Sequence, residues 1–272
     1  MKKLLFIYNP LSGVGQLKAK LSDVLDIFVK AGYEVTVHPT QKYHDALEKT
    51  KSYTGEYDLV VCSGGDGTLD EVVSGMENRE KKVPIGYIPT GTTNDFASSL
   101  HISRNILEAA DTAVNGIPFA CDVGRFNEDF FIYIAAFGLF TDVSYETKQS
   151  MKNILGHLAY VLEGTKRIFN IPSYRIKVFH DGEFEVTLMK TPKNPIELNE
   201  LLGAIVMKQI NPDRMYSFRT GEIRFESVEE IPWTLDGEFG GVHDRVLIQD
   251  KKQGLQIMVK EGLEKGKPDF LE

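Results

Sequence analysis

Three glycines surround one carboxylate in Gly64-Gly65-Asp66-Gly67-Thr68, and this turn carries the clearest chemistry in the sequence. It follows the apolar run Leu59–Cys62 and precedes Leu69–Val73, so the pattern predicts a strand, a tight turn and the start of a helix. Backbone N–H groups at a helix N-terminus favour an anion, above all a phosphate. A carboxylate has the wrong charge to bind a phosphate directly, so Asp66 indicates a bound metal ion between the two. We therefore expect a nucleoside triphosphate with magnesium. Glycine turns also occur in α/β folds that bind no phosphate.

Two more polar glycine loops follow apolar strands in the first hundred residues. Asn9-Pro10-Leu11-Ser12-Gly13-Val14-Gly15 is not a Walker loop, because the Gly-Lys-Ser/Thr ending is absent, and it is not a GxGxxG fingerprint. Pro89–Phe96 offers hydroxyls and a glycine before a further helix, which Asn94 or Asp95 could cap. Loops after successive parallel strands gather at one edge of the sheet, where ligands bind, so we expect the three loops to form one site.

A fourth candidate, Leu235-Asp236-Gly237-Glu238, places two carboxylates around a glycine after an apolar stretch. A plain β-turn also explains the Asp-Gly pair. If the turn faces the glycine loops across a cleft, one of the two carboxylates could accept the proton of an attacking hydroxyl. The residues leave both interpretations open.

The order of the expected elements indicates an α/β fold in the N-terminal half. Strands and helices alternate up to about residue 120, which predicts a mostly parallel sheet with helices on both faces. The expected strands are 3–8, 33–38, 59–62 and 84–88, and the expected helices are 16–31, 43–54, 70–78, 94–100 and 106–115.

The second half reads mainly as strand, typical of an antiparallel β-sandwich or barrel. We expect helices over 150–169 and 195–207, a turn at Asp181-Gly182, and a domain boundary near residue 122. The predicted strands are 119–126, 129–137, 174–180, 183–189, 222–226, 233–235, 245–249 and 256–259.

Composition limits the function classes. The 272 residues carry a net charge of −8, which argues against a general nucleic-acid binder. Cys62 and Cys121 lie in or beside apolar stretches and are expected to be reduced core residues, and the scattered histidines favour no zinc site. The longest apolar run, Phe130–Phe140, is too short for a membrane-spanning helix. We therefore expect a cytoplasmic protein, with a peripheral membrane role left open.

Taken together, the strings NPLSG, GGDGT, PTGTTNDF and LDGE resemble, in order and approximate spacing, the bacterial diacylglycerol kinase-like soluble lipid kinases, which include relatives of sphingosine kinases. GGDGT alone is shared with NAD kinases and, more loosely, with phosphofructokinases. The resemblance implies ATP-dependent phosphorylation of a lipid hydroxyl, typically diacylglycerol to phosphatidic acid. It also implies a Rossmann-like nucleotide-binding domain with a mostly parallel sheet over 1–122, to which a tail over 261–272 could return, and an antiparallel β-sandwich lipid-substrate domain over 123–260.

The resemblance gives roles to residues at the matching positions. Asp236 and Glu238 would form the catalytic pair together with Asp66, and which of the pair takes the proton stays open. Asp66, Asp95 and Asp122 would join in a hydrated magnesium network. Contacts to ATP and its Mg²⁺ would come from Asn9, Pro10, Ser12, Gly13, Thr40, Gly64, Gly65, Asp66, Gly67, Thr68, Gly91, Thr92 and Asn94.

Two segments of the second half need separate treatment. After Glu185 the resemblance implies further strands, a lipid-facing loop and a structural magnesium site, which are not found in the sequence. Either the chain is truncated internally or a disordered segment is missing from the sequence, so no residue is assigned to that magnesium site. Residues 148–169 carry an apolar stripe flanked by basic residues, which predicts either packing against the sheet or contact with anionic lipid.

As partners we expect a lipid substrate at the membrane surface, with peripheral association at the inner face of the membrane, and no nucleic acid. Two copies could pair through exposed sandwich edges. The alternative functions are an NAD kinase, which shares GGDGT, and a lipid- or nucleotide-binding relative without catalysis.

Overall fold

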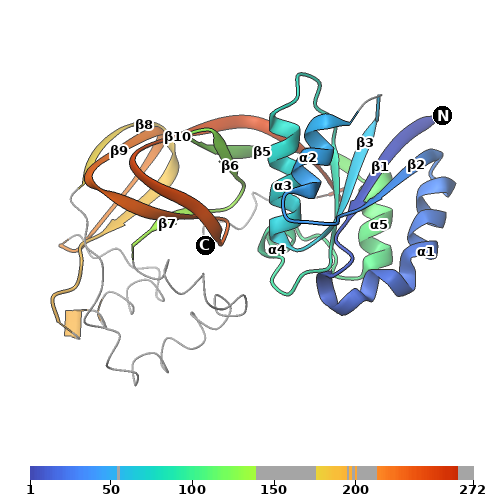
Figure 1. Cartoon of the computed structure of the whole chain (residues 1–272), viewed down its shortest axis with the longest axis horizontal. Coiled ribbons are helices and arrows are strands. Elements are labelled where there is room, and N and C mark those ends of the chain that lie inside the picture. Colours follow the sequence, from blue (N-terminus) through green and yellow to red (C-terminus); the bar gives the residue numbers. More distant parts are fainter. Residues whose placement is uncertain (54–55, 139–175, 195, 198–199, 201–212, 263–272) are drawn as a thin grey trace. The chain divides into compact units, whose positions relative to one another are not determined.

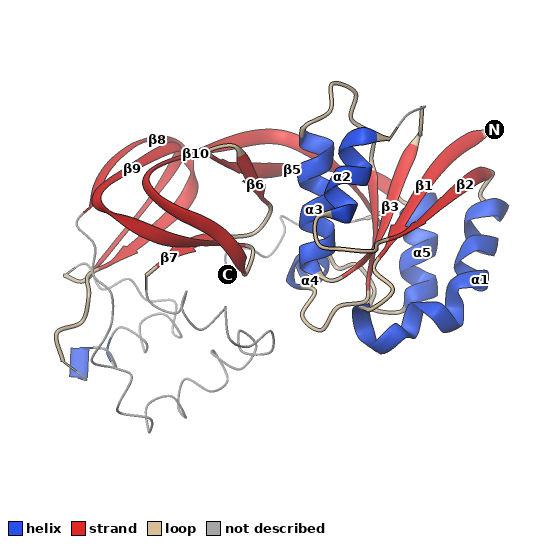
Figure 2. Ribbon diagram, viewed as in Figure 1, coloured by secondary structure: helices blue, strands red, loops and turns tan. Residues whose placement is uncertain are grey.

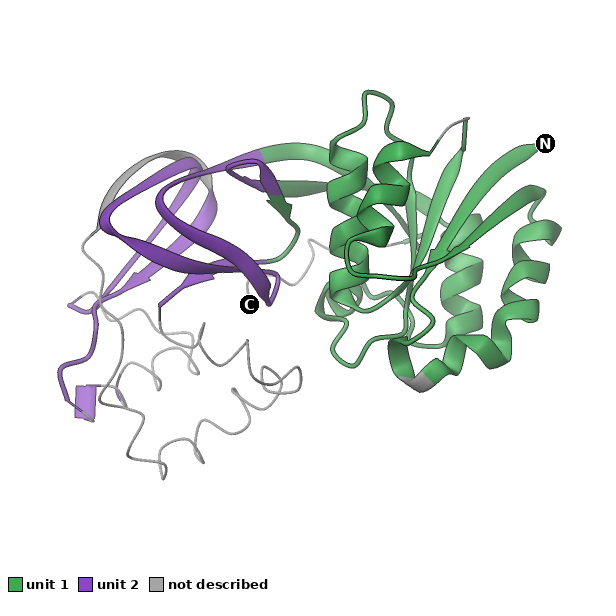
Figure 3. Ribbon diagram, viewed as in Figure 1, with its two compact units in different colours: residues 1–123, 130–133, 251–272 green, residues 124–129, 134–250 purple. Residues whose placement is uncertain are grey.

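The computed structural model describes residues 1–53, 56–138, 176–194, 196–197, 200 and 213–262. The chain divides into two compact units, shown in Figure 3. The first comprises residues 1–123, 130–133 and 251–272, and the second comprises residues 124–129 and 134–250.

Some predicted segments lie outside the described residues. They are the helix over 150–169, most of the helix over 195–207, and residues 263–272 of the tail. The assignment of nucleotide binding to 1–122 and of lipid binding to 123–260 stays a prediction.

A parallel sheet forms the centre of the first unit, with strand order β2-β1-β3-β4. Figures 1 and 2 show α1 and α5 on one face of this sheet and α2 and α3 on the other. The predicted alternation of strands and helices is therefore confirmed. The bounds are β1 Lys2–Tyr8, α1 Gln16–Lys30, β2 Tyr33–Pro39, α2 Asp45–Ser52, β3 Leu59–Gly64, α3 Asp66–Glu77, β4 Ile85–Pro89, α4 Asp95–Ser99 and α5 Ile106–Asn115, with a 3-10 turn over Ser12–Gly15.

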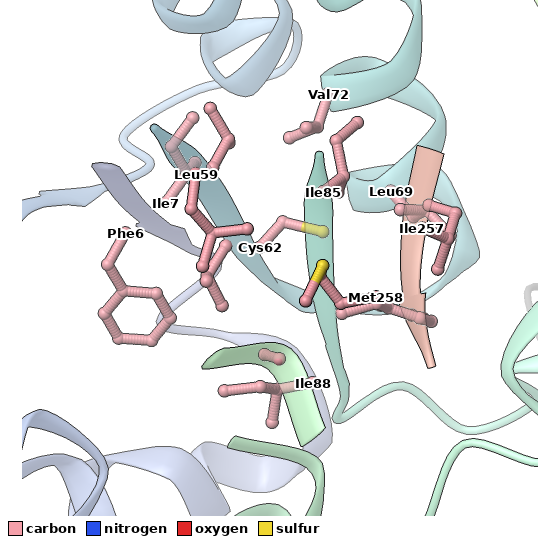
Figure 4. Close-up of a cluster of buried hydrophobic side chains, with 14 of the residues drawn as sticks. Phe6, Ile7, Leu59, Cys62, Leu69, Val72, Ile85, Ile88, Ile257 and Met258 are labelled. Atoms are coloured by element: carbon pink, nitrogen blue, oxygen red, sulfur yellow. The ribbon is translucent and has the colours of Figure 1, made fainter. Parts of the chain in front are cut away.

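Helices on both faces explain why β3 reads as one apolar run. Leu59, Val60 and Val61 are at most 2% exposed, and burying each such side chain contributes about 1.5–3 kcal/mol. Figure 4 shows this core, where side chains from five elements meet: Phe6, Leu69, Cys62, Ile85 and Ile257.

Both cysteines are free thiols, as predicted. Burial raises the pKa of the Cys62 thiol above its usual value. Burial, and to a smaller degree the charge of Asp122, raises the pKa of Cys121 to about 12. Both thiols therefore stay protonated at neutral pH.

Two side chains, one in α3 and one just after its end, hold the two ends of α2. Glu71 accepts hydrogen bonds from the backbone N–H groups of His44 (3.0 Å) and Ala46 (3.1 Å), at the helix end where negative charge is favourable. At the other end the Arg79 guanidinium lies 3.6 Å from the centre of the Tyr53 ring. Arg79 also donates to the last carbonyls of the helix and its cap, on Thr50, Lys51 and Tyr53.

Gly75 lies where α2 and α3 approach most closely. A Cβ at this position would lie 2.6 Å from Cβ of Thr50 and 2.8 Å from the carbonyl oxygen of Leu47. Glycine is therefore required for the two helices to pack in this way. Because α3 begins at the Gly64–Thr68 turn, that turn and the position of α2 are coupled.

A buried ion cluster joins the end of α3 to a later segment of the same unit. The Glu77 side chain is fully buried and pairs with the ammonium groups of Lys82 (2.6 Å) and Lys251 (3.4 Å). Lys82 also donates to the carbonyl of Gly254 at 3.0 Å. The cluster fixes the segment where β10 (Glu238–Val259) enters the first unit and pairs with β4 through Ile257 and Ile85.

The second unit consists of long antiparallel strands. β9 (Met215–Leu235) pairs with β8 (Ile176–Met189), with β10 and with β7 (Ala135–Phe137). β5 (Ile117–Phe126) and β6 (Asp129–Phe131) form the hairpin predicted at Asn127-Glu128, where Asn127 has a φ of 53°. Trp233 is 1% exposed, and its ring centre lies 4.5–5.2 Å from those of Phe126, Phe137 and Phe225.

Several predicted interruptions in this half are wrong. The strands predicted at 222–226 and 233–235 are parts of β9, and those at 245–249 and 256–259 are parts of β10. The predicted turn at Asp181-Gly182 is a register shift inside β8, between Asp181 and Phe184. Asp-Gly is a local turn signal, but continued pairing with β9 on both sides outweighs that signal.

Replacing both lysines of the ion cluster by methionine should destabilise the protein. The Lys82→Met/Lys251→Met variant leaves the Glu77 carboxylate buried without a cation, which costs about 3–5 kcal/mol of unfolding free energy. Urea unfolding at pH 7 measures the loss. As a matched control, adding Glu77→Met should return the stability to within about 1 kcal/mol of the parent, because no buried charge remains. A double variant as stable as the parent would contradict this account.

Candidate functional site

Three glycine loops meet at the carboxyl edge of the parallel sheet, as predicted from their places after β1, β3 and β4. Backbone hydrogen bonds join them: Asn9 N–H donates to the carbonyl of Ser63 (2.9 Å), and Thr90 N–H donates to the carbonyl of Gly64 (2.8 Å). Thr40, after β2, donates to the carbonyl of Tyr8 at 2.9 Å. The predicted phosphate-contacting segments therefore share one edge of one sheet.

Glycines allow these loops to touch through their backbones. A Cβ on Gly91 would lie 2.5 Å from Cα of Gly65. A Cβ on Gly13, which has a φ of 59°, would overlap the carbonyl oxygen of Thr90. Side chains at Gly13 and Gly91 would push the loops apart, so glycine is needed there for contact as well as for conformation.

The Gly64–Thr68 turn opens α3 four residues earlier than predicted. α3 begins at Asp66 rather than at Asp70. Asp66, Gly67 and Thr68 therefore form the first helical turn, where the positive end of the helix dipole favours an anionic ligand. The predicted start was late because glycine and aspartate at 65–67 read as loop residues.

The Asp66 carboxylate is the best candidate for a cation ligand. Its Oδ2 accepts a hydrogen bond from the Asp95 N–H at 3.2 Å. Its Oδ1 is buried and has no hydrogen-bond partner among the described residues. A buried carboxylate oxygen without a partner fits a metal ion or a metal-bound water, since Mg²⁺ is usually held by one or two carboxylates, several waters and substrate phosphates.

The three predicted metal carboxylates are not equivalent. Asp95 opens α4 directly beside Asp66. Asp122 is exposed on β5, and its Oδ1 accepts from the Gln253 N–H at 2.8 Å. Within the described part of the chain, no three His, Cys, Asp or Glu side chains lie close enough together to hold a metal ion by themselves. The magnesium network of Asp66, Asp95 and Asp122 stays a prediction.

Asn94 shapes the third loop from inside. It is 3% exposed with a φ of 53°, and its side chain bonds both the N–H (3.0 Å) and the carbonyl (2.7 Å) of Gly91. The prediction that its side chain could cap α4 is wrong, since that side chain bonds Gly91 instead. The amide is committed to holding Gly91 against the second loop.

Tyr87 is a site residue that the sequence analysis missed. Its hydroxyl lies 3.3 Å from the Gly64 carbonyl and 3.4 Å from Asn94 Oδ1, so it joins the second and third loops from beneath. Burial, followed by the negative charge of Asp66, raises the pKa of this phenol well above its usual value. A tyrosine inside the otherwise apolar strand Ile85–Ile88 was the available signal.

The Asp236-Gly237 pair lies in the second unit, in a two-residue turn between β9 and β10. Asp236 (φ 48°) and Gly237 (φ 85°) are both left-handed, as a tight hairpin of this kind requires. Ile134, the residue just before β7, positions Asp236. Its N–H donates to Asp236 Oδ1 at 2.7 Å, and Asp236 N–H donates to the Ile134 carbonyl at 2.8 Å. Glu238 is exposed.

A parallel sheet with glycine loops and a buried carboxylate at its carboxyl edge defines a class of α/β proteins that bind phosphorylated ligands. Residues 3–126 match the family model of the diacylglycerol kinase catalytic domain. The chain is 33% identical to the diacylglycerol kinase of Bacillus subtilis (strain 168), over 89% of this chain and 91% of that protein. It is 32% identical to the diacylglycerol kinase of Staphylococcus carnosus (strain TM300), over 88% and 90%.

The chain therefore belongs to the diacylglycerol kinase family and is a lipid kinase. A solved structure of a diacylglycerol kinase from Bacillus anthracis str. Sterne matches with a TM-score of 0.73 at 19% identity, covering 96% of this chain and 98% of that chain. Another structure from the same organism gives a TM-score of 0.79 at 20% identity, with the same coverage. These likenesses confirm the predicted fold.

The comparisons also bear on chain length. The alignment with the B. subtilis protein spans 277 positions but includes 89% of 272 residues, or about 242, so about 35 positions (277 minus 242) hold no residue of this chain. The relative therefore has residues at these positions, where this chain has none. That these positions lie after Glu185 stays a prediction. No helix in the described part of the chain is long and apolar enough to cross a membrane.

Alanine at Gly91 and alanine at Gly65 should have different effects on stability. Gly91→Ala pushes Cβ against Cα of Gly65 and should cost about 1–3 kcal/mol, as overpacking does. Gly65→Ala meets its nearest neighbour, Cα of Gly91, at 3.4 Å, an ordinary contact, and should change stability by less than about 1 kcal/mol. Thermal unfolding without ligand measures both, and equal losses would contradict the loop contact described above.

Proposed function

We propose that this lipid kinase transfers the γ-phosphoryl group of ATP, with Mg²⁺, to a diacylglycerol hydroxyl and so forms phosphatidic acid. The observation that carries the proposal is the buried Oδ1 of Asp66, which has no hydrogen-bond partner in the described part of the chain, at the point where three glycine loops converge. The names of the aligned relatives support diacylglycerol as the acceptor.

The chain's own residues would act mainly by positioning and charge neutralisation, which suffice for phosphoryl transfer. Loop amides and the N-terminus of α3 would bind the ATP phosphates. Asp66, with Asp95 beside it, would hold the hydrated cation, whose charge offsets that of the phosphates when it is bound. The nucleotide contacts predicted for Asn9, Pro10, Ser12, Thr40 and Thr92 belong to this proposal.

The transfer step needs one proton acceptor. The lipid hydroxyl oxygen bonds to the γ-phosphorus, the bond to the β–γ bridging oxygen breaks, and the hydroxyl proton passes to a carboxylate, leaving ADP and phosphatidic acid. Asp236 and Glu238 are the proposed acceptor pair. One oxygen of Asp236 is held by the Ile134 N–H, which fixes the orientation of that carboxylate.

The lipid substrate implies action at a membrane surface, and we propose peripheral association with the inner face of the membrane and a cytoplasmic location. Pairing of two copies and the absence of a nucleic-acid partner are further parts of this proposal. The rival acceptor, NAD, is tested in the same assay as the lipids.

Labelled γ-phosphate should pass from ATP to diacylglycerol in mixed micelles when Mg²⁺ is present. Chelation of Mg²⁺ should abolish the transfer, and Asp66→Asn should reduce it by at least about a hundredfold, as loss of charge stabilisation does. Sphingosine and NAD serve as parallel acceptors. Label in NADP would move the assignment to NAD kinase. Bound ATP without transfer to any acceptor would indicate a binding protein.

Conservative amides at the two carboxylates should identify the proton acceptor. Asp236→Asn keeps an oxygen for the Ile134 N–H but cannot take a proton, and Glu238→Gln is the matched change on its neighbour. The variant that lacks the acceptor should lose about 10²–10⁴-fold in kcat, with unchanged ATP affinity and thermal stability. Full activity in both variants would contradict the proposed role of the pair.

A further inference from the structure

We propose that one face of the sheet in the second unit, next to the Asp236-Gly237 turn, binds the acyl chains of the diacylglycerol substrate. This inference rests on the function proposed above and assigns a binding surface to it. We call this surface the apolar face, and it comprises Ile134, Ala136, Pro232, Thr234, Phe239 and Val242.

Strand register places these residues on one side of the sheet. Thr234 pairs with Ala136 on β7 and with Phe239 on β10, and Pro232 pairs with Val242. Directly opposed residues of antiparallel strands share a face, and residues two apart along a strand do too. Ile134 lies two residues before Ala136 and extends the same face toward the turn.

A β-bulge at Gly240-Gly241 is the device that brings Phe239 and Val242 together. The register shifts between these two residues, so side chains three positions apart point to the same side. Gly241 has a φ of 89°, and a Cβ on Gly240 would lie 2.7 Å from Cγ of Leu235. Without the bulge, Val242 would lie on the face opposite to Phe239.

Three side chains of the apolar face are exposed although the opposite face is core. Ile134, Phe239 and Val242 are 41%, 55% and 45% exposed. On the other side, Trp233 and Leu235 are 1% and 6% exposed. None of the six residues carries a charge, so the surface suits the uncharged chains of a neutral lipid. Contiguous apolar side chains left in contact with solvent mark binding surfaces.

The apolar face adjoins a proposed proton acceptor. Ile134 N–H lies 2.7 Å from Asp236 Oδ1, so a member of the face directly contacts that carboxylate. In diacylglycerol the free hydroxyl and the two acyl esters sit on neighbouring carbons of one glycerol unit. A carboxylate that receives the hydroxyl proton must therefore have the start of the acyl chains within a few ångströms, and the apolar face is at that position.

Thr234 adds an independent observation. It is 6% exposed, and its Oγ1 is buried with no hydrogen-bond partner among the described residues. A buried hydroxyl of this kind needs an explanation in a folded protein. An ester carbonyl of a bound lipid would supply the missing acceptor, in the middle of the face that receives the chains.

Polar substitutions on the apolar face should weaken lipid binding selectively. Phe239→Ser and Val242→Ser should raise KM for a long-chain diacylglycerol about tenfold, with KM for ATP unchanged, because apolar contact area is lost. The increase should shrink for a diacylglycerol with six-carbon chains. Val228→Ser is the matched control, since Val228 is 98% exposed on β9 but outside the face, and it should behave like the parent.

A second readout does not depend on turnover. A diacylglycerol carrying a diazirine in one acyl chain should crosslink within 134–136 or 232–242, and Phe239→Ser should reduce the yield. If the parent chain transfers phosphate to diacylglycerol while Phe239→Ser and Val242→Ser keep the parental KM, this inference fails and the proposed function stands. If the parent transfers nothing to lipid, the function itself fails.

The other occupant of such a face would be a second copy of the chain. A dimer in solution that Phe239→Ser dissociates, together with crosslinks elsewhere, would make the face an interface between copies and would overturn the lipid assignment. Sedimentation of the parent and the variant measures this outcome.

Discussion

The carbonyl of Gly64 is the point on which the candidate site depends. It accepts hydrogen bonds from Thr90 N–H (2.8 Å), Gly91 N–H (3.2 Å) and the Tyr87 hydroxyl (3.3 Å), so the end of one strand fixes the loop after the next. Asn94 then holds Gly91 from its other side. None of these contacts uses Oδ1 of Asp66 or the first turn of α3, so both are left for a ligand. Hydrogen bonds hold the loops together, and the part of the site left for a ligand is polar.

The same helix that opens at this turn organises the rest of the first unit. Glu71 and Gly75 of α3, with Arg79 just after its end, position α2 at its start, middle and end. Glu77 then secures the entering segment of β10 through two lysines. The Gly64–Thr68 turn, the contacts with α2 and the ion cluster of Glu77 therefore lie along one helix and the residues just after it.

Sequence reasoning succeeded where local pattern and tertiary environment agree. The strand and helix order, the core strand Leu59–Cys62 and the gathering of three loops at one edge follow from apolar periodicity and from the geometry of parallel sheets. It failed where pairing over long distances decides the outcome, as at Asp181-Gly182, which continues a strand. It also missed Tyr87 and the Ile134 backbone, because neither residue type signals a partner that only the folded chain supplies. The helix start at Asp66 was placed late because glycine has a low helix propensity, which the folded structure overrides in the first turn of α3.

One strand has a consequence for how the protein is made. β10 runs without a break from Glu238, beside the Asp236-Gly237 turn, to Val259, and its Ile257 lies next to Ile85 in the parallel sheet of the first unit. The edge that carries the three glycine loops is encoded in the first hundred residues, yet β4 lacks its β10 neighbour until residue 257 has been synthesised. Such a long sequence separation slows folding and leaves an open edge on β4 during synthesis. The fold thus ties completion of the sheet beneath the candidate site to prior synthesis of the Asp236-Gly237 turn.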